Sequence, residues 1–447
     1  MTSFSALQSF AQVVLRLALF IFLVPHAALA QDSHPADPAQ PTLYLHATLI
    51  DTATGEVHRN ASLLVRDGLI QSVANSSEAT PGVNLVDLQG KYVLPGLINT
   101  HVHLAVGKPD PLLARAYLRR ELFSGVTTVR DMADDVRLVG ELKREAASGE
   151  IESPDIFYVA LVAGPDFFSD PRSSDASVGY PPGGAPWMRA VAADSDLRQV
   201  IAEARGTGAS AIKIYADLPA TLVSGITAEA HRQGLLVWAH AAVFPASPLE
   251  VIRSNVDVVS HSDLLAYQLF PEMPARYASA PALPAQADYD GPRMAVVYRE
   301  MKERGIILDA TVDLAYRYPS MKLSPSASSA IAAAAHRHGV MISTGTDDDP
   351  DWNNPDSALI DEIERLAQSA GFSPMEALHA ATVVSARAAG RQNVAGKLQP
   401  GYAADFVVLK ENPLENLENL RSVETVVKHG VAHLRKDYVP FRPAARH

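Results

Sequence analysis

Cysteine is absent from this chain of 447 residues. Without thiols the protein forms no disulfide, no cysteine-type zinc finger, no iron–sulfur cluster and no thiol nucleophile. Any metal ion must therefore be held by imidazole, by carboxylate or by a group built from lysine. The lack of cysteine also fits a protein that works in an oxidising compartment.

Positive charge is in short supply as well. Lys and Arg number 38 against 50 Asp and Glu, which gives a net charge of −12. Because nucleic-acid binding needs a basic face that displaces counterions, we expect no nucleic-acid partner. Hydrophobic residues make up 47% of the chain, which excludes wholesale disorder and fibrous repeats. The length fits two or three ordinary domains, or one large barrel with an appended domain.

Hydrophobic runs of membrane-spanning length are also missing. The apolar run LALFIFLV at residues 17–24 follows Arg16 and is shorter than the roughly 20 residues that a spanning helix needs. Ala-Leu-Ala at 28–30 is an A-x-A cleavage pattern, which predicts a signal peptide over residues 1–30 and a mature protein that begins at Gln31. A buried helix is the alternative, but the Pro- and Asp-rich stretch that follows favours export. We expect a periplasmic or secreted protein with no membrane insertion after cleavage.

Two patterns of secondary structure divide the rest of the chain. Residues 43–94 alternate apolar and polar residues between turns, which predicts short, mostly antiparallel strands, and residues 395–435 return to this pattern. Between these segments, eight buried-type strands alternate with helical patterns over about 300 residues, which is typical of a (β/α)₈ TIM barrel. We expect the eight strands at Leu94–His103, Val126–Asp131, Ile156–Val162, Ala211–Tyr215, Leu235–His240, Val256–His261, Ile306–Thr311 and Val340–Thr346.

The sequence therefore predicts an α/β protein with two folded parts. Residues 95–394 form the predicted barrel. Residues 31–94 and 395–447 combine into a small β-sandwich domain built from both chain ends. In such a barrel, catalytic groups stand at the carboxyl ends of the strands, where alternate side chains face inward.

Six candidate metal ligands stand at the ends of five expected strands. His101 and His103 are two residues apart, so both rings face the same side, and Lys213 lies on the opposite face from its two Ile neighbours. The fifth, sixth and eighth strands add two more imidazoles and a carboxylate at the same end of the barrel. Imidazole and carboxylate suit Zn²⁺ and its neighbours. The six candidates are His101, His103, Lys213, His240, His261 and Asp347.

Each candidate also has a structural interpretation. A single histidine at a strand end is commonly a hydrogen-bonded structural residue, and Lys213 could form an ion pair with Asp347. Asp347 in turn heads an acidic run that could be a solvated loop. His336 and His338 provide a comparison, because they lie in a helical stretch where residues two apart point about 200° apart. We expect that second pair to lie on the surface.

Three segments resemble signatures of the metal-dependent amidohydrolase superfamily. VLPGLINTHVHL resembles the first barrel strand of that family, SGVTTVRD resembles the second, and GKLQPGYAADFVVLKENPL resembles the return strand of its β-domain. Within the superfamily the chain looks like the imidazolonepropionase-like branch, which contains exported Xaa-Pro dipeptidase-like and other amide-cleaving enzymes. IKIYAD is similar to the fourth strand of the binuclear members, where the lysine is N-carboxylated and bridges two metal ions.

The resemblance implies a complete metal centre. It implies two divalent ions, with Zn²⁺ the expected metal, and a CO₂-derived carbamate on Lys213 between them. His101 and His103 would hold the first ion, and His240 and His261 the second. Asp347 would also bind the first ion and act as the catalytic residue that transfers the proton.

Two segments depart from the family pattern. Many relatives carry a Gly-His-rich stretch after the third strand, whereas this chain has AGPDFF at 163–168. Relatives often have a histidine shortly before the acidic helix after the eighth strand, whereas this chain has SALIDEIERL. We expect both departures to affect the choice of substrate.

The expected reaction is cleavage of an amide bond in an Xaa-Pro-like dipeptide or an N-acyl amino acid, by attack of a metal-bridging hydroxide. Long segments at 163–192 and 262–290 carry many aromatic residues that could shape the pocket. Tyr215, Arg130 and Arg317 are candidate substrate contacts, although each could instead be a packing residue.

Two other classes of function stay open from the residues alone. One is a deaminase or cyclic-amide hydrolase on the same fold, and the other is a non-catalytic exported protein that binds a metal or a solute. In each case the partner is a small molecule, and we expect a homo-oligomer.

The first testable prediction concerns export. N-terminal sequencing of the protein from its native host should begin at or near Gln31, because the cleavage pattern ends at residue 30. A cytoplasmic protein that still carries Met1 would contradict this prediction.

Overall fold

The computed structural model describes residues 40–75, 82–105, 109–283, 287–318, 324–348 and 351–442. The predicted signal peptide lies outside the described residues. Within them, no helix combines the length and the apolar character that a bilayer crossing requires.

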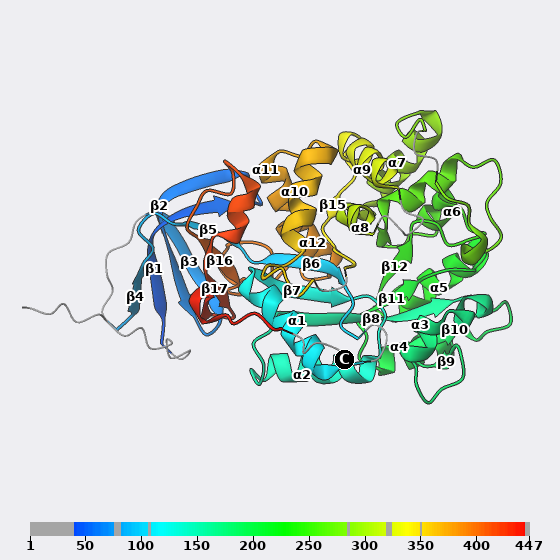
Figure 1. Ribbon diagram of the computed structural model, residues 1–447, viewed down its shortest axis with the longest axis horizontal. Coiled ribbons are helices and arrows are strands. Elements are labelled where there is room, and N and C mark those ends of the chain that lie inside the picture. The colour runs from blue at the N-terminus through cyan, green and yellow to red at the C-terminus, as the bar shows by residue number, and fades with distance from the viewer. Residues whose placement is uncertain are drawn as a thin grey trace, which may run out of the picture. The chain divides into compact units, whose positions relative to one another are not determined.

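Strands from both chain ends share one mostly antiparallel sheet. Figure 1 shows the blue N-terminal strands beside the red C-terminal ones. Along the sheet the order is β18-β17-β16-β5-β1-β2-β3, and β4 pairs with β1. Apolar side chains on its inner face form a separate core, in which the rings of Tyr44 and Phe406 meet edge to face at 5.0 Å. The strands are β1 (Thr42–Asp51), β2 (Glu56–Arg66), β3 (Leu69–Asn75), β4 (Asn84–Asp87), β5 (Tyr92–Pro95), β16 (Phe406–Leu409), β17 (Val423–Lys428) and β18 (Val431–Leu434).

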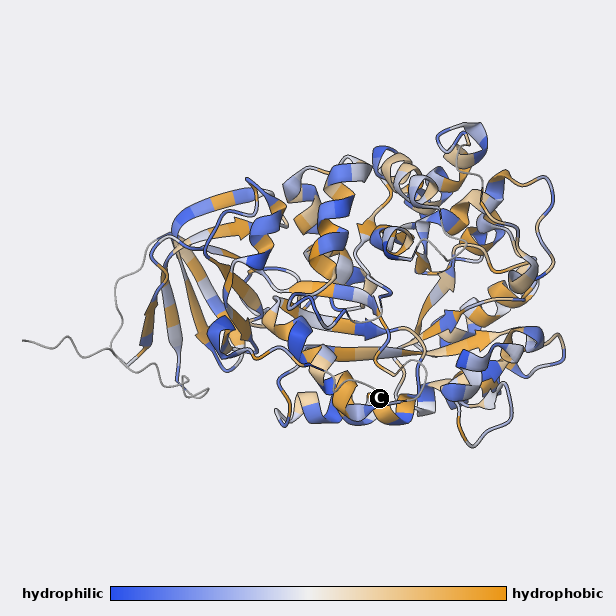
Figure 2. Ribbon diagram, viewed as in Figure 1, coloured by the Kyte–Doolittle hydropathy of each residue, from blue (hydrophilic) through white to orange (hydrophobic). Residues whose placement is uncertain are grey.

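Eight parallel strands of the described chain form the barrel. Each pairs with the next, and the ring closes where the Thr100 amide donates to the Thr344 carbonyl at 2.9 Å. Figure 2 shows these strands mostly in the hydrophobic colours, as expected of strands buried on both faces. The predicted TIM barrel with a sheet domain from both chain ends is thus confirmed. The strands are β6 (Leu97–Val102), β7 (Val126–Asp131), β8 (Asp155–Ala163), β11 (Ala211–Ile214), β12 (Leu236–His240), β13 (Val258–Ser260), β14 (Ile307–Asp309) and β15 (Ile342–Ser343).

Helices between the strands cover the barrel, and several of them begin at side-chain caps. Asp110, Asp135 and Asp196 accept backbone N–H groups at the starts of α1, α2 and α4, and Ser373 forms a capping box with Glu376 at α11. The helices are α1 (Pro111–Phe123), α2 (Val136–Ala147), α4 (Leu197–Gly206), α5 (Ala220–Arg232), α6 (Pro248–Arg253), α7 (Pro292–Arg304), α8 (Val312–Arg317), α9 (Pro325–Arg337), α10 (Leu359–Ala370), α11 (Pro374–His379), η4 (Ala380–Val384) and α12 (Ser385–Ala388); the sheet domain adds η5 (Leu417–Arg421) and η6 (Arg435–Asp437).

The two long loop segments contain short elements of their own. The loop after β8 folds into η1 (Pro165–Ser169), α3 (Pro171–Asp175), β9 (Gly184–Ala185) and β10 (Met188–Ala190), and β10 pairs in parallel with β8. The loop after β13 contains η2 (Ser262–Leu269) and η3 (Tyr277–Ser279). The sequence shows these segments as irregular because such short elements carry no periodic pattern.

A buried ion cluster joins the sheet domain to the amino end of the barrel. Lys428, at the end of β17, is 6% exposed, and its Nζ lies 3.0 Å from Oδ2 of both Asp405 and Asp155. Asp155 is the first residue of barrel strand β8, and its other oxygen lies 3.0 Å from His429 Nε2. The ammonium thus sits between two carboxylates from different parts of the fold, at the opposite end from the candidate metal ligands.

Lys428 is expected to contribute strongly to stability. Lys428→Met should lower the free energy of unfolding by about 3–5 kcal/mol, because it leaves the buried Asp405 carboxylate without its partner. Urea unfolding followed by circular dichroism measures this change. Lys91→Met is the control, since the half-exposed pair of Lys91 with Glu424 should be worth about 0–1 kcal/mol. Equal losses in both variants would contradict the assignment.

Candidate metal centre and active-site cavity

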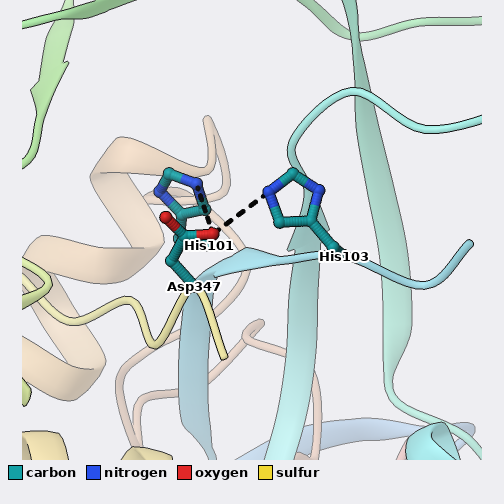
Figure 3. Close-up of side chains that lie close together, drawn as sticks. All are labelled: His101, His103 and Asp347. Atoms are coloured by element: carbon teal, nitrogen blue, oxygen red, sulfur yellow. Dashed lines mark ion pairs between the residues drawn. The ribbon is translucent and has the colours of Figure 1, made fainter. Parts of the chain in front are cut away.

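His101, His103 and Asp347 meet at the carboxyl end of the barrel. Figure 3 shows both rings directed at one carboxylate oxygen. Nε2 of His103 lies 3.1 Å, and Nε2 of His101 3.6 Å, from Oδ1 of Asp347. Strand β15 can approach β6 this closely because residue 345 is glycine, where a Cβ would come within 2.5 Å of both His101 and Asp309.

Lys213, His240 and His261 complete this group. Lys213 is 1% exposed, and its Nζ donates to the Ser260 hydroxyl at 2.8 Å. The His261 ring lies 5.1 Å from that of His101 and 4.9 Å from that of His240, measured between centroids. All six residues proposed as metal ligands line one cavity of about 240 Å³.

Burial disfavours the charged forms of Lys213, His240 and His261. It lowers the pKa of Lys213 to about 8, even though Asp309 and Asp347 raise it. It also lowers the pKa of His261 to about 3 and that of His240 well below its ordinary value. Neutral imidazole is the form that binds a metal ion, and a neutral amine is the form that reacts with CO₂.

The carboxylates around His101 and His103 favour positive charge. Burial raises the pKa of Asp347, but His101, His103 and His261 outweigh this effect and hold it below its ordinary value. For His103, burial lowers the pKa, but hydrogen bonds to Asp134 and Asp347 raise it well above the usual range. A cation between His103 and Asp347, whether a proton or a metal ion, is therefore strongly stabilised.

The hydrogen bonds of the histidine Nδ1 atoms indicate whether these side chains can bind a metal ion. His101 Nδ1 contacts Asp309 Oδ2 at 2.7 Å, and His103 Nδ1 contacts Asp134 Oδ1 at 3.3 Å. His261 Nδ1 contacts the Thr311 hydroxyl at 3.0 Å. Metal-binding histidines almost always use their other nitrogen in this way, which leaves Nε2 for the ion.

His240 is oriented differently. Its buried Nδ1 finds no hydrogen-bond partner among the described residues, which is costly unless an ion occupies that side. The donor set thus fits a metal centre. Asp134 and Asp309 were not predicted from the sequence, although a carboxylate inside the apolar run IILDAT was a signal for Asp309.

Of the three predicted substrate contacts, one lines the cavity and two do not. Tyr215 lines the cavity, with its ring 3.9 Å from that of His240. Arg130 does not line it: it is fully buried and donates to the carbonyl of Ala389 at 2.7 Å. Arg317 does not line it either, because it pairs with Asp313 and Asp361. For both arginines, the structure supports the alternative of a packing residue.

The rest of the cavity lining is mostly apolar. The loop after β8 contributes one charged side chain to it. That side chain is Arg172, at the start of α3. His336 on α9 and the capping residue His338 just after it are partly exposed and lie outside the cavity lining, and His338 pairs with Asp290 at 2.8 Å. The apolar lining comprises Met132, Ala133, Leu161, Phe167, Ala176, Met188 and Leu314.

Known proteins are similar to this chain in sequence and in fold. Ochratoxinase from Aspergillus niger is 25% identical in an alignment that covers 87% of this chain and 85% of that protein. Adenine deaminase from Serratia proteamaculans is 39% identical, but over only 20% of this chain and 14% of that protein. The crystal structure of a Xaa-Pro dipeptidase with bound methionine shares the fold, with a TM-score of 0.70 at 20% identity over 88% of this chain and all (100%) of the other.

A family model decides the classification. The model of the amidohydrolase family matches residues 92–432, which include the barrel and the returning strands of the sheet domain. This match confirms the resemblance seen in the sequence motifs. The chain belongs to the amidohydrolase family and is a hydrolase of that family.

Proposed function

We propose that this protein is an exported binuclear amidohydrolase that cleaves the amide bond of an Xaa-Pro-like dipeptide or an N-acyl amino acid. The observation that carries the proposal is the convergence of four imidazoles, one lysine and one carboxylate on a single cavity. A mononuclear deaminase would leave the buried Lys213 without a role, and a simple binder would have little need of Asp347.

The relatives support the class of substrate. Ochratoxinase, named for ochratoxin, and a Xaa-Pro dipeptidase, named for a peptide-bond substrate, are both similar to most of this chain. The apolar cavity lining suits a bulky apolar acyl group. The A-x-A pattern at residues 28–30 supports export.

The chain's own residues would build the centre as follows. His101 and His103 would hold one ion, His240 and His261 the other, and carboxylated Lys213 would lie between them. When bound, the two ions supply a hydroxide near neutral pH and polarise the scissile carbonyl. Zn²⁺ suits this set of nitrogen and oxygen donors.

Lys213 and Asp347 have distinct chemical tasks. The neutral Nζ of Lys213 forms a bond to the carbon of CO₂ and releases a proton, which leaves a carbamate. A carboxylate oxygen of Asp347 accepts the proton of the attacking water and passes it to the nitrogen that leaves. The C–N bond breaks, water is consumed, and a carboxylic acid and an amine are released.

A metal and activity assay tests the proposal directly. The purified protein should contain two divalent ions per chain and hydrolyse dipeptides or N-acyl amino acids, and a chelator should abolish this activity until Zn²⁺ is restored. Lys213→Ala should lose most activity and at least one ion, with partial recovery when short carboxylates are added. Lys302→Ala, an exposed control on α7, should match the wild type.

The outcomes separate the candidates. Full activity and both ions in Lys213→Ala would rule out the bridging carbamate. Activity only on nucleobases or cyclic amides would point to the alternative reaction on this fold. Stoichiometric metal with no hydrolysis of any amide would favour a non-catalytic binding protein.

Proton transfer by Asp347 gives a separate prediction. Asp347→Asn should lower kcat by at least about 10²–10⁴-fold, the usual effect of removing a general acid or base, and loss of a metal ligand adds to it. His336→Ala and His338→Ala should stay near the wild-type rate because both lie outside the cavity. Comparable damage in all three variants, measured by steady-state kinetics, would contradict the role of Asp347.

A further inference from the structure

The mouth of the cavity carries a guanidinium that the metal chemistry does not use. Arg172 lies in the first turn of α3, and its side chain is 54% exposed. Among the described residues that line the cavity, Arg172 and Lys213 are the only Lys or Arg side chains. Since Lys213 is buried among the metal ligands, Arg172 is the cation there that a substrate can meet as it enters.

Asp170 orients this guanidinium and uses only part of it. The Asp170 carboxylate caps α3 by accepting the backbone N–H of Arg172 at 2.9 Å, and it also accepts from Nε at 3.1 Å and from Nη2 at 2.7 Å. Within the described part of the chain, Nη1 donates to no protein atom. A guanidinium has five N–H donors, so most of them stay available for a second anion.

Two phenols lie beside Arg172. Tyr215 and Tyr277 approach each other with ring centroids 5.8 Å apart. The Arg172 guanidinium interacts electrostatically with both phenols. A phenolic hydroxyl carries its proton at neutral pH and can donate a hydrogen bond.

This group of donors adjoins the metal centre on the His240 side. The Tyr215 ring lies 3.9 Å from the His240 ring, and the Tyr277 ring lies 5.8 Å from it. The main-chain N–H of Tyr277 donates to Asp217 Oδ1 at 2.8 Å, which fixes the start of η3. An anion bound here would thus stand next to the carbonyl that is cleaved.

We propose that Arg172, oriented by Asp170, binds the free carboxylate of the substrate together with the hydroxyls of Tyr215 and Tyr277. The inference rests on the proposed function and makes Arg172 the residue that selects substrates with a carboxylate beside the scissile amide. In N-acyl amino acids and dipeptides, the carboxylate is attached to the carbon next to the amide nitrogen. Arg172 stands in the loop where this chain lacks the family's Gly-His-rich stretch.

The kinetic test compares an N-acyl amino acid with its carboxamide. Arg172→Gln should raise KM for the free acid by about 10–100-fold, in line with the loss of a hydrogen bond to a charged group, and change kcat much less. KM for the carboxamide should stay unchanged, so that the preference for the acid disappears. Arg172→Lys should recover part of it, because it keeps the charge but loses the planar fork.

Arg276→Gln is the matched control. Arg276 stands on the facing loop, is exposed, pairs with Asp166 at 3.0 Å and does not line the cavity. The Arg276→Gln variant should leave KM unchanged for both the free acid and the carboxamide. Equal effects of Arg172→Gln on the acid and the carboxamide, or an equal effect of the control variant, would overturn the inference.

Calorimetric binding of a non-hydrolysable N-alkyl amino acid separates this inference from the proposed function. Binding that is lost in Arg172→Gln and kept in Arg276→Gln supports carboxylate recognition even if the wild type hydrolyses no amide, in which case only the proposed function fails. Binding that is unaffected by Arg172→Gln overturns the inference even if amide hydrolysis is found. The metal content of both variants should match the wild type.

Discussion

Closure of the barrel between its first and last strands is the constraint on which the site depends. The amides of Thr346 and Asp347 donate to the carbonyl of His101 at 3.2 and 2.9 Å. The same residues thus close the ring of strands and bring the Asp347 carboxylate to the histidine pair. Since residue 345 must be glycine for this approach, the site and the barrel are formed by one packing arrangement.

The carboxylates beside His101 and His103 favour the binding of a cation where the first and last strands meet. Asp309 contacts the His101 ring, Asp134 contacts the His103 ring and Asp347 contacts both, and each carboxylate is largely buried. Buried carboxylates are stable only beside positive charge or hydrogen-bond donors. Burying these carboxylates in an apolar barrel costs free energy. Their hydrogen bonds to the imidazoles, which also orient the rings, and their attraction for a cation bound between them offset this cost.

Strand periodicity predicts the barrel and the six candidate ligands because it gives the face and the end of each strand. It does not give the partners that a side chain finds across the fold. Arg130 stands near a strand end, as a substrate contact would, yet its guanidinium is taken by Ala389 and Ser210. Arg317 lies on a helix, where Asp313 four residues earlier was the available signal for an ion pair. Asp134 and Asp309 were missed because their histidine partners are distant in sequence.

The pairing of strand β5 with strand β16 has a consequence for the order in which the protein forms during its synthesis. Strand β5 leads directly into the first barrel strand, but its antiparallel neighbour β16 is made only after all eight strands of the barrel. The sheet therefore stays incomplete on the ribosome while the helices and strands of the barrel emerge. Partly made chains expose the unpaired edge of β5 for that time, so the sheet is completed only after the barrel has been made.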